Sequence, residues 1–485
     1  MRILMLDIDT LRPDHMSCYG YNRATTPNMD KICEDGIRFD RYYCSDAPCL
    51  PSRAALISGM FGIRNGAVGH GGTAADRRNT GKERGFTDVL DQNNFHNIFR
   101  RAGLHTVSIS TFPERHSSWW FCAGFNECYN VGKSGLESGE EVLPVALDWL
   151  ERNGRQDDWF LHVHFWDPHT PYRAPKEFGN PFEKDSFDCW IDAETFELHK
   201  KHTGPHSINE LNMFDDLTSH AFPRALGKAE NYDELRQVFD GYDCGVRYTD
   251  YLVGQIFDWL REHGLYDETA IIITSDHGEN MGELGIYSEH ATADHPTCHI
   301  PFILKWPGGV QGKSDPSLHY NLDLLPTMAD LLKVKHCENW DGISYSSAVI
   351  NGVPCGRDSL VLSQMAHVCQ RSARFEDWLY IRTYHDGFHL FESEMLFNIT
   401  EDPYEQHDVS KEHPEICAKG AKIILDWHDE QMHRSDSLID PMWTVIQEGG
   451  PYHTLGQLEN YLKRLEATNR HEGAEKLKEK YFKRS

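Results

Sequence analysis

The sequence has no long hydrophobic run. No part of its 485 residues approaches the ~20 consecutive apolar residues that a membrane-spanning helix needs. The apolar opening at residues 3–6 is interrupted by Asp7 and Asp9, so it is too short and too acidic for a secretory signal peptide. We therefore expect a cytoplasmic protein that works without a membrane.

Positive charge is also scarce. The 48 lysines and arginines are outnumbered by 75 aspartates and glutamates, and the net charge of −27 argues against a protein that binds nucleic acid. An acidic protein that binds an anion must gather positive charge locally, through a metal ion or a few arginines. The 13 cysteines show no framework or zinc-site spacing, which fits a reducing compartment.

Through the first two thirds of the chain, apolar segments of strand length alternate with segments of helical periodicity. Strands are expected at 2–9, 104–110, 159–165, 270–274 and 300–305, and helices at 26–36, 95–102, 140–151, 233–263 (unbroken or as a pair) and 322–332. This alternation predicts an α/β fold with a large, mixed, mainly parallel sheet between layers of helices. In such sheets, ligands bind at the carboxyl ends of the strands.

The pattern changes after residue 355. Short antiparallel strands are expected at 360–362, 378–383 and 388–396, and charged helices at 414–434 and 454–483. We therefore divide the chain into a catalytic α/β domain at 1–355 and a smaller C-terminal α+β domain at 356–485. Residues 174–231, which are weakly periodic, are expected to form an insertion on the substrate side. The sequence leaves the oligomeric state open, and a homo-oligomer is compatible with it.

Acidic residues end two of the expected strands. Asp7 and Asp9 occupy alternate positions, so their side chains share one face of the first strand. Asp276 and His277 end a later strand. Because buried carboxylates are costly unless they are paired or bind a cation, these two strand ends predict a divalent metal site. The oxygen ligands favour Ca²⁺, with Mg²⁺ or Mn²⁺ as alternatives.

The pentapeptide Cys49-Leu50-Pro51-Ser52-Arg53 starts a short predicted helix that ends at Gly59. Proline suits the first turn of a helix because its fixed φ and missing N–H cost nothing there. Cys49 is therefore expected at a helix N terminus, where the N–H groups and the dipole favour negative charge. This position suits a reactive thiol or a nearby anionic substrate, although a lone cysteine is more often a small buried hydrophobe.

The pentapeptide resembles the signature of type I sulfatases, the formylglycine-dependent members of the alkaline phosphatase superfamily. Five further segments resemble motifs of this family in the same order: Asp9 to His15, Asp167 to Tyr172, Thr274 to Glu279, Pro301 to Pro307, and Leu396 to Pro403. The resemblance covers the chain from about residue 1 to about residue 410. Phosphonate monoester hydrolases are the close relatives of these enzymes.

The resemblance implies a nucleophile made from a cysteine. A formylglycine-generating maturation enzyme would convert Cys49 to an aldehyde, whose hydrate attacks sulfur and whose oxygen also binds the metal. Arg53 would stabilise the hydrated aldehyde. His169, from the segment Asp167-Pro168-His169, would bind the sulfate or protonate the leaving oxygen.

The resemblance also implies the metal ligands. Asp9, Asp276 and His277 would hold the cation together with matured Cys49. Many members have two consecutive aspartates at the first motif, whereas Thr10 follows Asp9 here. Asp7 is the candidate for the missing carboxylate.

Two lysines of the family pattern are absent. Ser110-Thr111-Phe112-Pro113 stands where Gly-Lys-x-His is frequent, and Thr111 resembles the threonine that phosphonate monoester hydrolases place in this region. The second lysine is replaced within Tyr287-Ser288-Glu289-His290. His290 is therefore a candidate catalytic residue, and His70 and His116 are candidates for binding the substrate.

The leading interpretation is a sulfatase that hydrolyses a small anionic sulfate ester, such as a carbohydrate sulfate, with a formylglycine and one divalent cation. The alternative is hydrolysis of phosphonate monoesters or phosphodiesters at the same site. A two-metal phosphodiesterase with a Ser or Thr nucleophile and a non-catalytic binding protein also stay open. The residues Cys49, Arg53, Asp9, Asp276 and His277 favour catalysis, since no structural role needs all five.

Overall fold

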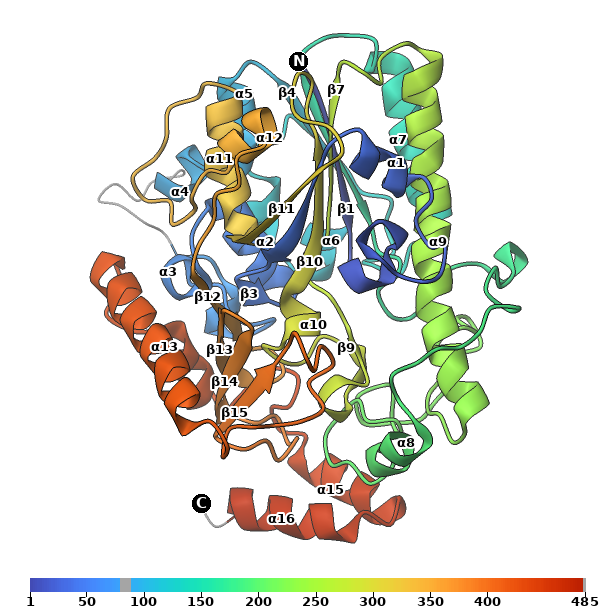
Figure 1. The fold of residues 1–485 in the computed structure, drawn as a ribbon, viewed down its shortest axis with the longest axis vertical. Coiled ribbons are helices and arrows are strands. Elements are labelled where there is room, and N and C mark those ends of the chain that lie inside the picture. Colours follow the sequence, from blue (N-terminus) through green and yellow to red (C-terminus); the bar gives the residue numbers. More distant parts are fainter. Residues whose placement is uncertain (79–88, 483–485) are drawn as a thin grey trace.

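The computed structural model describes residues 1–78 and 89–482. An eight-stranded sheet with the strand order β11-β2-β10-β7-β1-β6-β4-β5 forms its centre (Figure 1). The strands of this sheet are β1 (Arg2–Ile8), β2 (Ile37–Tyr43), β4 (His105–Ile109), β5 (Glu127–Tyr129), β6 (Trp159–Phe165), β7 (Thr269–Thr274), β10 (His299–Lys305) and β11 (Lys313–Tyr320). Only β10 runs antiparallel to its neighbours, so the prediction of a mixed, mainly parallel sheet is confirmed.

Helices cover both faces of this sheet (Figure 1). The helices within residues 1–355 are α1 (Met29–Glu34), α2 (Cys49–Ser58), α3 (Gly62–Asn65), α4 (Val89–Gln92), α5 (Phe95–Arg101), α6 (Phe112–Arg115), α7 (Gly139–Asn153), α8 (Ala193–His199), α9 (Tyr232–Glu262), α10 (His295–Cys298), α11 (Leu324–Leu331) and α12 (Ser346–Asn351). The predicted long helix at 233–263 is a single helix, α9.

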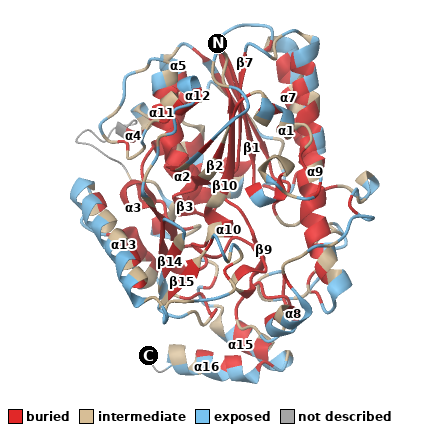
Figure 2. Cartoon of the chain, viewed as in Figure 1, coloured by how far each residue is buried: buried red, intermediate tan, exposed pale blue. Residues whose placement is uncertain are grey.

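The side chains of β1 alternate between the two cores. Leu4 and Leu6 pack in the cluster that contains α7 and α9, whereas Ile3 and Met5 pack with α5 and α11. This period of two places Asp7 on the same face as Met5. Figure 2 shows that β1 and β7, at the centre of the sheet, are buried along their length.

A second sheet has the order β15-β14-β13-β12-β3. Its strands are β3 (Asp46–Ala47), β12 (Ser359–Gln364), β13 (Cys369–Phe375), β14 (Trp378–His385) and β15 (Glu394–Asn398), and β8 (Asn280–Met281) and β9 (Tyr287–Glu289) form a separate pair. β3 pairs with β12 in parallel and comes just before Cys49. The C-terminal sheet therefore anchors the segment that positions this cysteine. We propose to keep the domain boundary at 355, with β3 as the strand that joins the two parts.

The C-terminal helices cover this sheet and the segment 174–231. They are α13 (Pro414–Arg434), α14 (Pro441–Gln447), α15 (Leu458–Ala467) and α16 (His471–Phe482). Arg470 donates to Ser207 Oγ at 3.1 Å and Arg464 donates to the carbonyl of Asn209 at 2.7 Å. These contacts hold the loop around residue 207 against the rest of the molecule.

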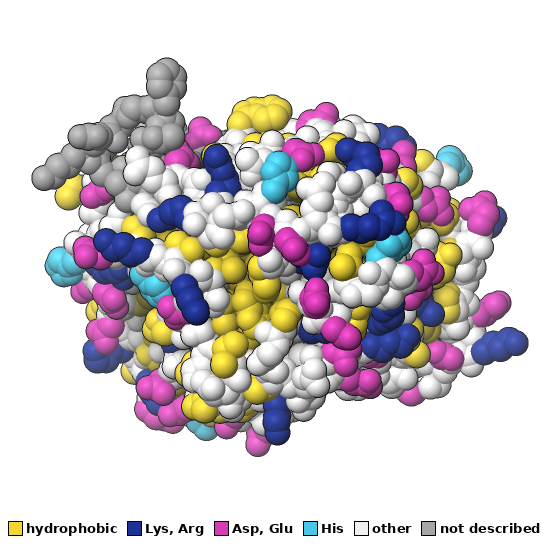
Figure 3. All heavy atoms as spheres, turned by 90° about the horizontal axis from the view of Figure 1, so that it is seen from above, with side chains coloured by type: hydrophobic (Ala, Val, Ile, Leu, Met, Phe, Trp, Pro, Cys, Tyr) yellow, Lys and Arg dark blue, Asp and Glu magenta, His cyan; other side chains and the backbone are white. Residues whose placement is uncertain are grey.

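Seven of the described strands were not predicted, and one was predicted too long. The missed strands are β2, β3, β5, β8, β9, β11 and β13. The strand expected at 388–396 begins only at Glu394. The expected C-terminal helix at 454–483 is two helices, with its last residue outside the described part of the chain. Among the described residues, no helix combines the length and apolar character that crossing a membrane requires. Figure 3 views the end opposite the carboxyl ends of the central strands, and shows acidic and basic side chains interspersed there.

Candidate active site

The candidate site forms where two neighbouring strands end beside the start of α2. β1 and β7 pair in parallel, with Asp7 opposite Thr274. Asp9 follows β1, and Asp276 and His277 follow β7, so all three reach the same edge of the sheet. Cys49 is the first residue of α2, which ends at Gly59 in the left-handed conformation. The predicted short helix is confirmed, and it begins two residues before Pro51.

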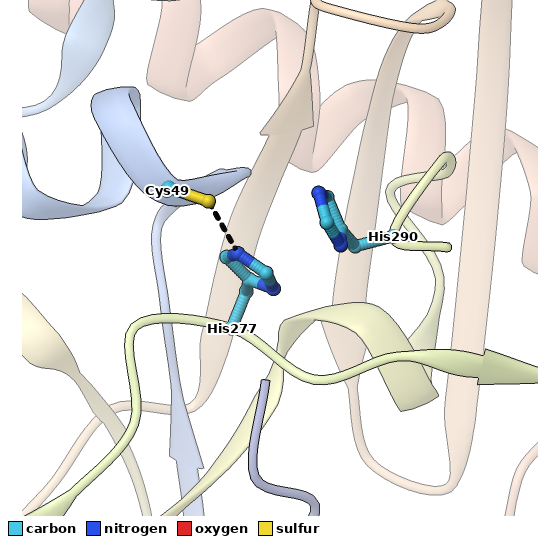
Figure 4. A group of neighbouring side chains, drawn as sticks. All are labelled: Cys49, His277 and His290. Atoms are coloured by element: carbon cyan, nitrogen blue, oxygen red, sulfur yellow. Dashed lines mark hydrogen bonds between the residues drawn. The ribbon is translucent and has the colours of Figure 1, made fainter. Parts of the chain in front are cut away.

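Four ligand atoms converge at this edge. The Cys49 Sγ lies 3.0 Å from His277 Nε2 (Figure 4). One side-chain atom from each of Asp9, Cys49, Asp276 and His277 lies within 4.8 Å of the others. His277 Nδ1 lies 2.8 Å from the carbonyl of Gly278, which can only accept, so this nitrogen carries the proton and Nε2 is free to bind a metal.

The Arg53 guanidinium is the cation at the centre of the site. It contacts Asp7, and its Nη2 lies 3.0 Å from Asp9 Oδ2 and 3.1 Å from Asp276 Oδ2. The same Nη2 donates to His164 Nε2 at 2.9 Å. Its contacts orient both carboxylates that end β1 and β7.

Burial sets the protonation of the cysteine. Burial, together with the carboxylates of Asp9 and Asp276, raises the pKa of the Cys49 thiol well above its usual range. The thiol is therefore protonated at neutral pH, and only the thiolate is a strong nucleophile. The environment is unfavourable for a cysteine nucleophile, in contrast with the reactive-thiol interpretation of the helix N terminus.

Burial also perturbs the two carboxylates. Burial and the neighbouring Asp276 raise the pKa of Asp9 well above its usual range. For Asp276, burial opposes ionisation, but Arg53 and His277 hold its pKa below the usual value. Two carboxylates this close favour a further cation between them.

Buried carboxylate oxygens with unused acceptor capacity fit a metal ion at this place. Asp9 Oδ1 is buried and accepts no hydrogen bond from the described residues, and Asp276 Oδ2 is buried with the ion pair to Arg53 as its contact. Asp7 is placed differently, because its Oδ2 contacts Arg53 and lies 3.1 Å from His162 Nε2, and it is not one of the four converging ligands.

Thr10, which follows Asp9 at this edge of the sheet, has a strained backbone conformation. Its φ of 57° is in the left-handed region, which a β-branched residue rarely adopts. Its backbone N–H lies 3.4 Å from Asp276 Oδ1, and its hydroxyl is buried without a partner among the described residues. Backbone strain of this kind clusters at functional sites. The sequence shows Thr10 only as a departure from the family pattern.

A cavity of about 530 Å³ opens above Cys49. His169, His290, His70 and His116, all predicted from the sequence, line it together with Cys49. The rings of His277 and His290 lie 4.1 Å apart, and Figure 4 shows both facing the cysteine.

Thr111 lies apart from the cavity. Its hydroxyl contacts Glu137 and accepts a hydrogen bond from Trp166 Nε1 at 2.8 Å. It is fully buried and is not part of the cavity lining. The Thr111 hydroxyl is therefore engaged with Glu137 and Trp166 rather than open to the cavity.

Several residues of the site were not recognised in the sequence. His162 and His164 lie at alternate positions of β6 and face Asp7 and Asp9, and this His-x-His pattern in a buried strand was a usable signal. His367 and His453 line the cavity but come from distant segments, with no local signal. Glu289 also lines the cavity, next to His290 in the segment 287–290 where the family pattern has a lysine.

The fold has helices on both faces of a mainly parallel sheet. At the carboxyl edge of this sheet, buried carboxylates face a helix N terminus. This combination defines an alkaline phosphatase-like hydrolase. The chain belongs to the sulfatase family, since the family model described as "Sulfatase" matches residues 3–334. It is a sulfuric ester hydrolase by this membership. The N-acetylglucosamine-6-O-sulfatase of Bacteroides thetaiotaomicron is 23% identical over 92% of this chain and 89% of its own.

Solved structures show the same fold. A protein in complex with its substrate D-glucosamine-2-N,6-O-disulfate gives a TM-score of 0.70 at 19% identity, covering 90% of this chain and 98% of that one. The phosphonate monoester hydrolase of Agrobacterium radiobacter gives a TM-score of 0.68 at 19% identity, covering 89% of this chain and 96% of that one.

Proposed function

We propose that this sulfatase hydrolyses a small organic sulfate ester, in particular a carbohydrate sulfate, through a formylglycine made from Cys49 and one divalent cation. The observation that carries the proposal is the meeting of Cys49, the first residue of α2, with the ends of β1 and β7 in a chain of the sulfatase family. The raised pKa of the thiol supports maturation, because an unmodified Cys49 would be a weak nucleophile.

Asp9, Asp276 and His277, with matured Cys49, would hold the cation. Their carboxylate oxygens suit Ca²⁺, and the imidazole keeps Mn²⁺ or Mg²⁺ open. When bound, the ion would supply positive charge to offset the charge on the transferred sulfate. Asp7 is left to orient Arg53, which it contacts directly.

The proposed hydrolysis has two steps, attack on sulfur and release of sulfate. Matured and hydrated, Cys49 would supply the hydroxyl that attacks sulfur, and the alcohol would leave with the proton of that hydroxyl. The second hydroxyl on the same carbon would give up its proton as the C–O bond to the sulfate breaks, so that sulfate leaves and the aldehyde is restored. Arg53, beside both carboxylates, would hold the hydrate in place. His169 and His290, on the cavity side of Cys49, face the sulfate and the leaving oxygen.

His169 has a defined tautomer. Its Nδ1 contacts the carbonyl of Thr170 and must donate to it, so a neutral ring presents an unprotonated Nε2. Burial, with His290 and Arg115, lowers the pKa of His169 well below its usual range. Protonation of the leaving oxygen would therefore require the substrate's negative charge to restore the second proton.

Production with a formylglycine-generating enzyme tests the proposal. Matured wild-type protein should hydrolyse 4-nitrophenyl sulfate and a sugar sulfate in the presence of Ca²⁺ or Mn²⁺, and a Cys49→Ala variant should not. Loss of all activity on chelation, restored by a divalent cation, is also expected. Equal activity of wild type and Cys49→Ala would refute the proposal.

Hydrolysis of phosphonate monoesters or phosphodiesters is the second candidate, favoured by the absent lysines and by the fold shared with phosphonate monoester hydrolases. Thr111, whose hydroxyl accepts from Trp166 Nε1, does not line the cavity, which weakens one argument for it. Parallel assays with matched 4-nitrophenyl sulfate and phenylphosphonate esters decide between the two by the ratio of kcat/KM.

A further inference from the structure

A second group of buried ligand atoms surrounds one carboxylate in the wall of the cavity. The carboxylate of Glu289, the last residue of β9, lies 2.8 Å from His290 Nε2, 3.0 Å from His206 Nε2 and 3.6 Å from His367 Nε2. All four residues are between 4% and 8% exposed. We call them the Glu289 cluster. It adjoins the site at Cys49, because the ring of His290 lies 4.1 Å from that of His277.

Hydrogen bonds do not account for the Glu289 cluster. His206 Nδ1 lies 3.1 Å from the carbonyl of Leu211, which can only accept, so in a neutral ring this nitrogen carries the proton. His206 Nε2 then directs a lone pair at the carboxylate, and two acceptors this close repel each other unless a cation or proton lies between them. His206 Nε2 and His367 Nε2 are buried and make no hydrogen bond of good geometry with the described residues. Buried nitrogen atoms of this kind are rare and point to a bound ion or water.

The spacing of the cluster fits a metal ion with four ligands. Atoms that lie about 2.0–2.2 Å from a tetrahedral zinc ion are about 3.3 Å from one another. The three distances from the Glu289 carboxylate, 2.8 Å, 3.0 Å and 3.6 Å, span this value. The ring of His367 lies 5.8 Å from that of His290 at 86° and 6.3 Å from that of His206 at 69°. The imidazoles therefore approach the carboxylate in different planes, as ligands of one ion do.

The ligands come from three parts of the chain, and other contacts hold them in place. His206 lies in the segment 174–231, His290 follows β9, and His367 lies between β12 and β13. Gln364, the last residue of β12, joins two of them. Its Nε2 donates to the carbonyl of His290 at 2.9 Å, and its Oε1 accepts from the N–H of His367 at 3.1 Å. Outer contacts that fix the ligands in this way strengthen metal binding.

We propose that His206, Glu289, His290 and His367 form a second metal site and that it binds Zn²⁺. Zn²⁺ favours imidazole ligands, whereas Ca²⁺ favours oxygen, so the two neighbouring sites differ in the ion they prefer. Four protein ligands leave no open position, which is typical of a structural zinc site. The ion would join the segment 174–231 to the C-terminal sheet across the cavity. This inference goes beyond the proposed function, because it holds for the unmatured chain and for any substrate.

Metal counting on Cys49→Ala protein tests the proposal without turnover and without a thiol that could itself bind Zn²⁺. The full chain is treated with a chelator, dialysed against excess Ca²⁺ and a low concentration of Zn²⁺, and analysed by plasma mass spectrometry. We expect one Zn²⁺ per chain in addition to Ca²⁺. Co²⁺ in place of Zn²⁺ should give the intense visible absorption of a tetrahedral site.

Further variants of this protein locate the ion. His206→Gln and His367→Gln should each weaken Zn²⁺ binding by at least about 100-fold, because each removes a direct ligand and the loss of an outer contact alone costs about 10–100-fold. The two changes lie in different segments, so if circular dichroism shows that one variant is unfolded, the other decides. His116→Gln is the matched control, since this histidine lines the same cavity, and it should bind Zn²⁺ as tightly as the parent. Asp276→Asn should weaken Ca²⁺ binding and retain Zn²⁺.

The proposal is overturned if the Ca²⁺-saturated protein binds no Zn²⁺, or if the two ligand variants bind it as tightly as His116→Gln. Zn²⁺ that is lost from Asp276→Asn but retained by His206→Gln would lie at the first site, and this result also overturns the proposal. Failure of the proposed function has a different signature. In that case matured wild-type protein hydrolyses no sulfate ester, while the Zn²⁺ content of the variants still decides the inference.

Discussion

Replacing Arg53 with methionine tests whether buried charge organises the site. The guanidinium is 1% exposed and contacts the carboxylates of Asp7, Asp9 and Asp276. Removing one partner of a buried ion pair costs about 3–5 kcal/mol, because a charge stays buried without compensation. Since three carboxylates share this one cation, we expect the metal-free Arg53→Met protein to lose about 5 kcal/mol at pH 7.

Urea unfolding of chelated protein measures this loss. Arg53→Lys should lose less, about 2 kcal/mol, because the ammonium keeps the charge but cannot contact three carboxylates as a planar guanidinium does. Addition of Ca²⁺ should stabilise Arg53→Met more than wild type, since its uncompensated carboxylates bind a cation more tightly. Neither variant should turn over substrate at more than a small fraction of the wild-type rate.

Arg382→Met is the matched control. Arg382 pairs with Glu394 at 3.4 Å, and both side chains are 44% exposed, so the pair should contribute less than about 1 kcal/mol. If chelated Arg53→Met is as stable as the Arg382→Met control, or if Ca²⁺ stabilises it no more than wild type, the reasoning about the buried charges is refuted.

Three further predictions concern single side chains. Burial lowers the pKa of His96 to about 3, against ~6.5 in the unfolded chain. Its contribution to stability is therefore complete above pH 6.5 and decreases as the pH falls, by about 2 kcal/mol at pH 5. In thermal unfolding, His96→Phe should lose less stability than wild type between pH 7 and pH 5, and an equal loss contradicts the assignment. Thr10→Val, which removes the unpartnered hydroxyl, should weaken Ca²⁺ binding by about tenfold in calorimetry, whereas Thr10→Ser should retain most of the affinity. If His169 protonates the leaving oxygen, His169→Asn should slow an alkyl sulfate by about 10²–10⁴-fold and 4-nitrophenyl sulfate far less, because nitrophenolate needs no proton; equal losses assign His169 to binding the sulfate.

The central fold could be predicted because its signals are local. The buried strand β7 is an apolar run between two threonines, β6 is apolar except for His162 and His164, and α9 and α7 have clear helical periodicity. The missed strand β2 reads IRFDRYY, and its alternating Ile37 and Phe39 were a usable signal of period two. β11 contains Lys, Ser, Asp and Pro at the edge of the sheet, so its sequence does not resemble a strand.

The site could be predicted only where its residues end strands or start a helix. Asp9, Asp276 and Cys49 meet because parallel strands bring their carboxyl ends to one edge, which the alternation of elements already implies. His70 and His116 were predicted as candidates, but their meeting with His367 and His453 could not be, because His70 and His453 are separated by most of the chain and come together only in the folded protein. The reversed direction of β10 had no signal in its own residues.

The conversion of Cys49 to formylglycine is tested most directly by mass spectrometry of the tryptic peptide 42–53. This peptide contains Cys44 as well as Cys49, so Cys44 is an internal control for alkylation of an unmodified thiol. From active enzyme we expect one alkylated cysteine, Cys44, and an aldehyde at position 49 that makes the residue about 18 Da lighter than cysteine. Fully active enzyme in which both cysteines are alkylated would contradict the account.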